Sequence, residues 1–279
     1  MNYGHIQGRR IIGARYLVSG HNATLLLLED EDGRKLVAKQ AEGDAGSLDI
    51  EAAMLIYLRE HSALPVPEIF RAEPDLLVME HIPQRGGMTL LAEEEAAEHL
   101  AALHSVRGHF YGFEHDTLIG SLRQPNTPSD KWIPFFAEHR LLYMAEEACR
   151  EGRLDTPTTK RIEQLAGKIG TWLSEPEYPA LIHGDMWQGN VLVNDGKISG
   201  FIDPAIYYAD PEIELAFSTL FGTFSEPFFR RYQELRPLSD DFFDIRCELY
   251  NLYPLLVHVR LYGGGYVQSV AQTLRKYLG

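Results

Sequence analysis

The chain has 279 residues, of which 45% are hydrophobic and 24% charged, a composition typical of a globular protein with one large domain or two lobes. Its 40 acidic residues outnumber its 26 lysines and arginines, and the resulting net charge of −14 argues against a nucleic-acid partner. The longest aliphatic run, at 25–28, is too short to cross a bilayer, so no membrane partner is expected, and two distant cysteines, Cys149 and Cys247, favour reduced thiols in a cytoplasm over a disulfide.

The first forty residues have the pattern of three strands joined by turns. Asp-Glu-Asp-Gly at 30–33 predicts a hairpin turn between the second strand and the third. The turn between the first two strands contains a single glycine and is a weak match to a loop that covers nucleotide phosphates; its residues are Ser19, Gly20, His21 and Asn22. The predicted strands are 11–18, 24–29 and 35–40.

A lysine and a glutamate in this region are candidates for a functional pair. Lys39 lies within Leu-Val-Ala-Lys, which resembles the kinase strand whose lysine pairs the α- and β-phosphates of ATP. A helix is predicted over 49–60, and Glu51 lies beside its apolar stripe, 12 positions after Lys39. A strand lysine and a helical glutamate are ordinarily solvated charges, whereas in a kinase Glu51 would pair with Lys39 and fix its reach.

Two further strands lead into a segment that would join two lobes. The backbone N–H and C=O groups of Glu80, His81 and Ile82 could bond the edge of an adenine ring. A glycine-rich linker at 84–88 follows, and we place the boundary between a nucleotide-binding lobe and a second lobe beside it. The strands are 68–72 and 76–80, and the lobes are 1–83 and 84–279.

The second lobe is predicted to be mostly helical. We expect Thr156 to be the N-cap of one helix and Pro254 to kink another. The aromatic- and glycine-rich stretch 108–128 is expected to be a long loop. The predicted helices are 93–106, 131–147, 157–173, 210–220, 226–236, 240–262 and 266–278.

The stretch at 181–204 departs from this helical pattern and carries the strongest functional signal. It begins with His-Gly-Asp and continues as strand, Asn-Asp-Gly turn and strand. Asn190 follows five positions after Asp185, and Asp203 follows 18 positions after Asp185. A hairpin of this kind would point the three side chains to one side. Its predicted strands are 191–193 and 198–202.

These spacings suit phosphoryl transfer. The protein-kinase catalytic loop H-R-D-x-x-x-x-N also has its Asn five positions after its Asp, and a metal-binding Asp follows; here Gly replaces the Arg. In such a site Asp185 would orient an attacking hydroxyl and accept its proton, while Asn190 and Asp203 would hold Mg²⁺ beside ATP phosphate oxygens. The alternative is an ordinary turn at His-Gly-Asp, with Asp203 as a helix N-cap before Pro204.

Together these features resemble small-molecule kinases of the protein-kinase-like fold, such as aminoglycoside phosphotransferases and choline kinases. Finer features are similar to the fructosamine kinase, or ketosamine-3-kinase, family. The implied fold is α+β and bilobal, with a small antiparallel sheet and one helix in the N-lobe and a larger, mostly helical C-lobe that carries the catalytic hairpin. The motifs are HGDMWQGNVLV with Trp187, FIDPAIYYADPEIELAFSTLFG at 201–222, WIPFFAEHRL at 132–141, LYNLYPLLVHVRLYGGGY at 249–266, and Gly120 with residues 124–126.

The resemblance implies ATP-dependent phosphorylation of the 3-hydroxyl of a ketosamine, a sugar joined by glycation to a small amine or a protein. The 3-phosphate labilises the adduct, which links the family to protein deglycation. Trp187 would offer an apolar face to the sugar, and Tyr207 and Tyr208 would wall the acceptor pocket; core packing is the alternative for each. Some relatives carry a cysteine in the loop over the phosphates, which 19–24 lacks, so redox-sensitive dimerisation is not expected.

Two other functions stay open. One keeps the chemistry and changes the acceptor to an aminoglycoside or another small alcohol. The other is a pseudokinase that serves as a non-catalytic binding module. The presence of Lys39, Asp185, Asn190 and Asp203 together speaks against the second function.

Overall fold

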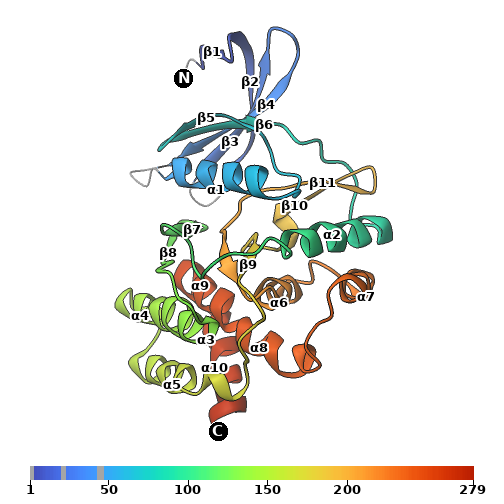
Figure 1. Ribbon diagram of the computed structural model, residues 1–279. Coiled ribbons are helices and arrows are strands. Elements are labelled where there is room, and N and C mark those ends of the chain that lie inside the picture. Colours follow the sequence, from blue (N-terminus) through green and yellow to red (C-terminus); the bar gives the residue numbers. More distant parts are fainter. Residues whose placement is uncertain (1–2, 20–22, 43–46) are drawn as a thin grey trace.

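The computed structural model describes residues 3–19, 23–42 and 47–279, which fold into two lobes stacked along the long axis of the molecule (Figure 1). The upper lobe is a sheet covered by one helix, and the lower lobe is mostly helical, so the predicted α+β bilobal fold is confirmed. The N-terminus lies in the upper lobe and the C-terminus at the far end of the lower lobe.

An antiparallel six-stranded sheet forms the N-terminal lobe, in the order β1-β2-β3-β4-β6-β5. All five strands predicted for this lobe are present, and the two-residue β1 was not predicted. Because Ala38 is buried on one face of the sheet, Lys39 projects from the other, and its cross-strand partner Leu77 belongs to the larger core. The strands are β1 His5–Ile6, β2 Arg9–Ser19, β3 Ala23–Asp30, β4 Lys35–Ala41, β5 Ile69–Glu73 and β6 Leu76–Glu80.

Helix α1 (Leu48–His61) covers the face of the sheet from which Lys39 projects (Figure 1). Its buried residues Ala52, Leu55 and Leu58 recur at the three-residue spacing of one helical face. This packing places Glu51 opposite Lys39.

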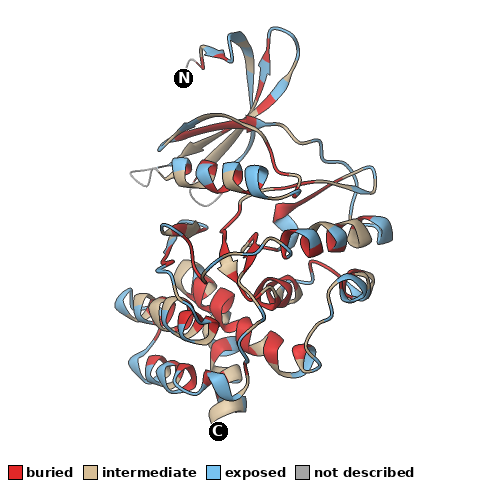
Figure 2. Cartoon of the chain, viewed as in Figure 1, coloured by how far each residue is buried: buried red, intermediate tan, exposed pale blue. Residues whose placement is uncertain are grey.

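Helices make up most of the C-terminal lobe, and their buried faces meet in its centre (Figure 2). The rings of Trp132, Phe136 and Tyr250 pack there with centroid separations of 5.5 Å and 5.2 Å for successive pairs. The helices are α2 Leu90–Leu103, α3 Trp132–Phe135, α4 Tyr143–Arg150, α5 Thr156–Ala166, α6 Glu212–Leu220, α7 Glu226–Leu235, α8 Cys247–Tyr250, α9 Leu252–Tyr262 and α10 Gly265–Leu278.

Two long predicted helices are interrupted. The first changes to a π-helix at Phe136–Leu142 between α3 and α4. The second consists of a π-helix at Phe242–Arg246, then α8 and α9, and α9 starts after Asn251. The expected kink at Pro254 is wrong, because this proline lies in the first turn of α9, where its missing N–H costs no hydrogen bond.

Two local predictions in the same lobe are also corrected. The N-cap of α5 is Asp155 instead of Thr156, because the Asp155 carboxylate accepts the N–H of Thr158 at 2.8 Å. The expected loop at 108–128 contains a short hairpin whose register pairs Thr117 with Gln124. Its strands are β7 Thr117–Ile119 and β8 Leu122–Gln124.

Two further strand pairs build the region between the lobes. The predicted hairpin is present as β10 and β11, while the pairing of β9 with β12 joins segments before and after it and was not predicted. The strands are β9 Ala180–Ile182, β10 Val191–Asn194, β11 Lys197–Phe201 and β12 Tyr207–Ala209.

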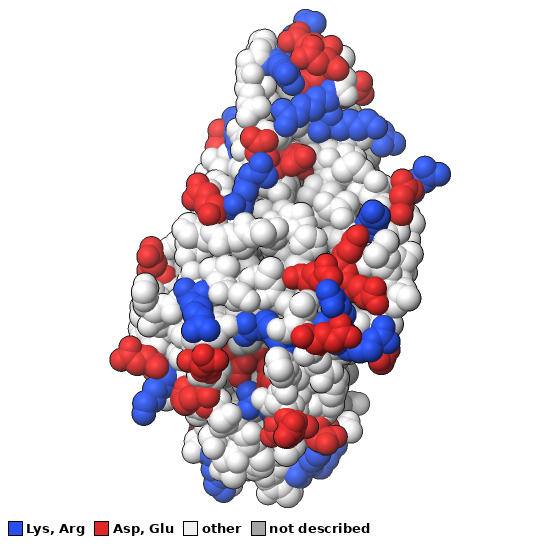
Figure 3. Space-filling view, turned by 45° about the vertical axis from the view of Figure 1, so that its right-hand side comes forward, with Lys and Arg blue, Asp and Glu red and all other residues white. Residues whose placement is uncertain are grey.

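The charged side chains do not form a single patch on the face shown in Figure 3. Acidic and basic groups lie beside one another at its upper and lower ends, while the uncharged surface lies toward the centre and left of the middle, with a group of acidic side chains to the right of it. Among the helices of the described ranges, none combines the length and hydropathy that a membrane span requires.

Candidate active site

The β10–β11 hairpin and the loop before it bring Asp185, Asn190 and Asp203 together. The side-chain amide of Asn190 donates to the Asp185 carboxylate at 2.9 Å and to the Asp185 carbonyl at 2.8 Å. The same Nδ2 lies 3.4 Å from the Asp203 carbonyl, so one amide ties together both ends of the hairpin. These bonds use only the nitrogen of Asn190 and leave its amide oxygen available to a cation.

Gly184 is required by the close approach of two backbone segments. Its φ is +85°, and a Cβ at this position would collide with the Ala205 carbonyl oxygen. The Ala205 N–H in turn donates to the His183 carbonyl at 2.7 Å. The loop that carries Asp185 therefore rests directly on the segment after Asp203, which explains why glycine replaces the arginine of the protein-kinase motif.

Lys39 connects the two lobes through two carboxylates. Its ammonium donates to Glu51 at 2.7 and 3.0 Å and to Asp203 Oδ1 at 3.0 Å. The side chains of Lys39 and Glu51 are only 16% and 13% exposed, so neither is a freely solvated charge. Asp203 has a φ of +53° and lies far from the start of α6, so it is not a helix N-cap.

Burial sets the acidity of these groups. Desolvation raises the pKa of Asp185 to about 7, and the nearby carboxylates of Asp203 and Glu214 contribute in the same direction. Desolvation also raises the pKa of Glu51 to about 7. Burial would raise the pKa of Asp203 too, but the Lys39 ammonium outweighs this effect and holds that pKa below its usual value. At neutral pH Asp203 is thus an anion, while Asp185 is close to its titration midpoint.

A chain of buried hydrogen bonds joins the Asp185 loop to helices α6 and α7. Glu214, on α6, accepts the Gly184 N–H at 2.6 Å and binds the ring of His104 at 2.7 Å. Tyr232, on α7, contacts the other His104 nitrogen at 2.7 Å. Our reading of the sequence missed these residues; the one local signal is an acidic residue within the apolar run of 213–217.

The predicted adenine-binding segment leads out of β6. The Glu80 N–H already donates to the Glu68 carbonyl at 2.8 Å within the sheet, so fewer groups are available there than predicted. The side chain of Ile82 lies against Gly200, and a Cβ added to Gly200 would lie only 2.5 Å from the Ile82 side chain. Of the predicted phosphate loop, Gly20, His21 and Asn22 lie outside the described residues, and the backbone of Ser19 ends β2 opposite Thr24.

The three predicted acceptor-site aromatics have different environments. Trp187 is 42% exposed, and its ring lies over Gly189, where a Cβ would collide with it. Tyr208 is half-buried, and its hydroxyl lies 3.0 Å from that of Tyr57 on α1. Tyr207 is 1% exposed and packs against the Arg140 guanidinium at 3.9 Å. Tyr207 is therefore a core residue and does not line an open pocket, so its predicted place in an acceptor pocket is wrong. Trp187 is not a core residue.

The oxygen donors at the hairpin fit a hard cation for which phosphate and water supply most of the ligands. Asp203 supplies a carboxylate and Asn190 an amide oxygen, as Mg²⁺ prefers when it bridges a nucleotide. The described residues contain no cluster of three or more His, Cys, Asp or Glu side chains that would bind a metal without a nucleotide.

Comparisons with known proteins agree with this geometry. The sequence model of the family described as fructosamine kinase matches residues 6–279. A "Probable ketoamine kinase" of Synechocystis is 39% identical over 185 residues, which are 65% of this chain and 60% of that protein. Another, from Vibrio parahaemolyticus, is 30% identical over 270 residues, 94% of this chain and 91% of that protein.

Solved structures show the same relationship. A structure from Thermobifida fusca, assigned in its name to the fructosamine-3-kinases, has a TM-score of 0.88 at 33% identity and covers 97% of this chain and 94% of its own. An aminoglycoside phosphotransferase solved with ADP and hygromycin B has a TM-score of 0.69 at 16% identity, with coverage of 97% and 96%, and shares the fold. The chain therefore belongs to the fructosamine kinase family, a group of phosphotransferases with the kinase-like fold.

Proposed function

We propose that this protein transfers the γ-phosphoryl group of ATP to the 3-hydroxyl of ketosamines. The observation that carries the proposal is the connected arrangement of Glu51, Lys39 and Asp203 on one side of the site, with Asp185 held by Asn190 on the other. The names of the relatives, ketoamine kinases and a fructosamine-3-kinase, support this acceptor class.

In the proposed reaction the sugar O3 forms a bond to the γ-phosphorus, and the bond from that phosphorus to the β,γ-bridging oxygen breaks, which releases ADP. Asp185 orients the hydroxyl and takes its proton, which then passes to solvent. The ammonium of Lys39, fixed by Glu51, offsets phosphate charge. Mg²⁺ held by Asn190 and Asp203 would supply further charge neutralisation.

The other predicted nucleotide contacts belong to the same proposal. His81 and Ile82, with the carbonyl of Glu80, would bond the adenine edge, and Ser19, Gly20, His21 and Asn22 would cover the phosphates. The lobe boundary between Pro83 and Gln84 would then be the point about which the lobes close on the nucleotide.

Trp187 and Tyr208 would form the acceptor side. The exposed indole beside Asp185 offers a flat surface to the C–H face of a sugar ring, and its N–H can reach a hydroxyl. Phosphorylation at O3 would labilise the glycation adduct, so we place the protein in deglycation of small amines or proteins in the cytoplasm.

An acceptor screen tests this function. Purified protein with Mg·ATP is offered fructosyl-amines, a glycated peptide, aminoglycosides, choline and homoserine, and ADP release and the phosphorylated product are both measured. We expect phosphate on O3 of the fructosyl-amines and of the sugar on the glycated peptide, and on no other acceptor. Turnover confined to an aminoglycoside or a small alcohol would refute the ketosamine assignment, and absence of turnover with Mg·ATP bound would indicate the pseudokinase alternative.

A further inference from the structure

Three sequence motifs that have no role in the site described above meet at one side chain. Arg140 is fully buried, at 0% exposure, within the π-helix Phe136–Leu142. Its guanidinium donates to the Pro125 carbonyl at 2.6 Å, to the Asn126 side-chain oxygen at 2.7 Å and to the His139 carbonyl at 3.0 Å.

Arg140 differs from Arg246 and Arg260, whose side chains are also largely removed from water, because it makes no ion pair within the described chain. Arg246 is paired with Asp210 and Glu212, and Arg260 with Glu147 and Glu151. The guanidinium of Arg140 instead lies 3.9 Å from the ring centroid of Tyr207, 4.7 Å from that of Phe135 and 5.4 Å from that of Tyr253, and its Nε has no partner.

Such an environment is unfavourable for a group that serves only to fill space. A buried cation without a carboxylate is costly, and aromatic faces and carbonyls offset only part of that cost. An apolar side chain of similar volume would fill the site more favourably. We therefore infer that the charged guanidinium, with its several N–H donors, is retained because of the groups that it binds. Its position in a π-helix is consistent with this, since π-helical turns are frequent at functional sites.

One group held by Arg140 is the β7–β8 hairpin. Asn126, which accepts from Arg140, donates to the Thr117 hydroxyl at 2.8 Å, and Gln124 donates to the same hydroxyl at 2.8 Å. Tyr253, from the third motif, donates to the Gln124 side-chain oxygen at 2.6 Å. The hairpin is thus held at its base by a continuous chain of buried hydrogen bonds.

The second group is the chain immediately after Asp203. Gln124 donates to the Ala205 carbonyl at 3.0 Å, and the Thr117 hydroxyl donates to the Ile206 carbonyl at 3.2 Å. Ala205 is the residue whose N–H binds the Asp185 loop at His183. The hydrogen-bonded path from Arg140 to that loop therefore runs through the segment that carries Tyr207 and Tyr208.

We propose that Arg140 is a positioning residue for the phosphoryl acceptor, which fixes the β7–β8 hairpin and residues 205–208 relative to Asp185. The proposal rests on the proposed function in treating this side of Asp185 as the acceptor site. The hydrogen bonds of Arg140 in the described chain all lie within the C-terminal lobe, and neither Lys39 nor Glu51 is among its partners, so we expect the acceptor to be affected more than ATP.

The test compares Arg140→Lys, Arg140→Met and Tyr253→Phe with the matched control Arg260→Lys. Lysine keeps the charge but lacks the planar guanidinium that donates to Pro125 and Asn126 at the same time. Methionine keeps only the approximate volume, and Tyr253→Phe removes one hydroxyl. The control changes an arginine whose side chain is 7% exposed and whose acidic partners lie on α4 and just after it. For each variant we would measure kcat, KM for the acceptor, KM for ATP, ATP hydrolysis without acceptor, and the melting temperature.

For Arg140→Lys we expect kcat/KM for the acceptor to fall about 10- to 100-fold, because displacement of a bound reactant by about 1 Å has that effect. KM for ATP and acceptor-free hydrolysis should stay within about twofold. Arg140→Met should lose more than Arg140→Lys, Tyr253→Phe should lose several-fold in the same direction, and Arg260→Lys should leave both KM values unchanged.

The proposal is overturned if folded Arg140 variants keep wild-type acceptor kinetics, or if the acceptor and ATP constants deteriorate together. If the Arg140 variants do not fold, Tyr253→Phe decides: wild-type acceptor constants in that variant overturn the proposal. Wild-type transfer to an aminoglycoside or a small alcohol instead of a ketosamine would refute the proposed function, and the same comparison made with that acceptor would still decide the role of Arg140.

Discussion

Asp185 occupies an environment that matches the task of a proton acceptor. Burial raises its pKa to about 7, while the Asn190 amide holds its carboxylate in place. A carboxylic acid that titrates near neutral pH can take a hydroxyl proton late in the transfer and release it to solvent.

The first prediction concerns pH. Only ionised Asp185 accepts a proton, so kcat/KM for the acceptor should rise with pH and level off above a midpoint at or below about 7, since a bound cation lowers the pKa. Asp185→Asn should lose roughly 10²- to 10⁴-fold in turnover while it still binds Mg·ATP. The profile and calorimetric nucleotide binding check both points. Near-wild-type turnover of Asp185→Asn would remove Asp185 from the chemistry.

The second prediction concerns the cation. Asp203 is an anion at neutral pH, because Lys39 lowers its pKa, whereas Asn190 is neutral and buried. Because a carboxylate is the stronger ligand for Mg²⁺, Asp203→Ala should weaken Mg·ATP binding more than Asn190→Ala does. Titration calorimetry with and without Mg²⁺ gives the order, and equal or reversed losses would show that the ligands are misassigned.

The third prediction concerns Trp187. Trp187→Ala should raise KM for a ketosamine at least several-fold and leave KM for ATP nearly unchanged. The reason is that the indole would bind the ketosamine equally in the ground state and the transition state, and ATP does not use this contact. Since the side chain is 42% exposed, the melting temperature should change little. A destabilised variant with an unaltered ketosamine KM would mean that the indole is structural.

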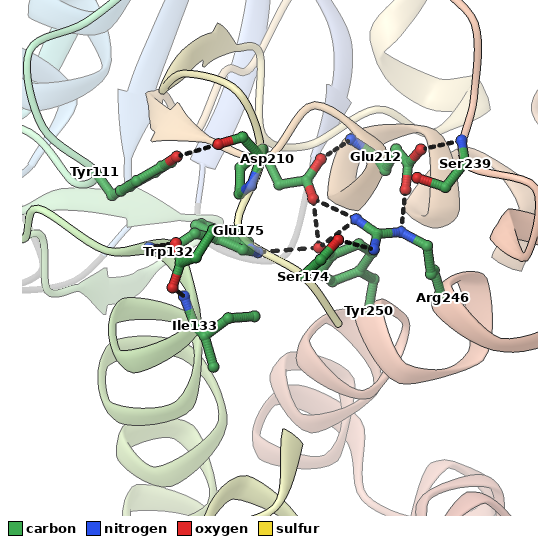
Figure 4. Close-up of polar contacts among 11 residues, drawn as sticks. Tyr111, Trp132, Ile133, Ser174, Glu175, Asp210, Glu212, Ser239, Arg246 and Tyr250 are labelled. Atoms are coloured by element: carbon green, nitrogen blue, oxygen red, sulfur yellow. Dashed lines mark hydrogen bonds and ion pairs between the residues drawn. The ribbon is translucent and has the colours of Figure 1, made fainter. Parts of the chain in front are cut away.

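At the scale of secondary-structure elements, a buried ionic cluster joins helices of the C-terminal lobe (Figure 4). Arg246 donates to Asp210 at 2.7 Å and also pairs with Glu212 at the start of α6. Tyr250 donates to the same Asp210 oxygen at 2.6 Å. Burial and the neighbouring Glu212 raise the pKa of Asp210 to about 6, and Arg246 counteracts them. This cluster supports the helix that carries Glu214.

The fourth prediction concerns Arg246. Arg246→Met leaves two buried carboxylates without a cation and should cost about 3–5 kcal/mol of stability at neutral pH. Without Arg246 the folded-state pKa of Asp210 rises further above its unfolded value, so protonation favours the fold and the deficit should grow as pH rises through about 6. Urea unfolding at about pH 5 and pH 8 measures it.

Arg230→Met is the control for this measurement, because Arg230 is 50% exposed and its ion pairs lie on the surface. Its stability should stay within about 0.5 kcal/mol of wild type at both pH values. A deficit in Arg246→Met that is equally small, or that shrinks as pH rises, would contradict the role of the cluster.

At the scale of the whole molecule, the two lobes share one apolar core, and polar contacts also join them. Lys39 reaches Asp203 across the lobe boundary at 3.0 Å, and Tyr57 on α1 reaches Tyr208 at 3.0 Å. The first contact lies on the side proposed for the nucleotide and the second on the side proposed for the acceptor. A change in the angle between the lobes would therefore alter both sides of the proposed site together.

Much of the candidate site could be read from the sequence because its geometry is local. Asp185 and Asn190 lie on one short loop, and a two-strand hairpin with an Asn-Asp-Gly turn returns the chain to Asp203. The Lys39–Glu51 pair also follows from the periodicity of a strand and of a helix. Alternation along the strand places Lys39 on the face of the sheet that the next helix covers, and the helical period places Glu51 beside the face of that helix that packs on the sheet. Local periodicity did not reveal the break at Asn251 or the π-helix at 136–142, because neither interrupts the apolar pattern.

The sequence by itself determined the five longer strands of the N-terminal lobe, the first helix, the β10–β11 hairpin and the family, since each depends on residues close together in the chain or on a contiguous motif. Only the tertiary structure decided which buried polar groups meet. His104 finds Glu214 at a separation of 110 residues, and Gln124 finds Tyr253 at 129. Such partners are selected by burial, because a polar group removed from water is stable only beside another that satisfies it, and no local pattern records which segment will supply that partner.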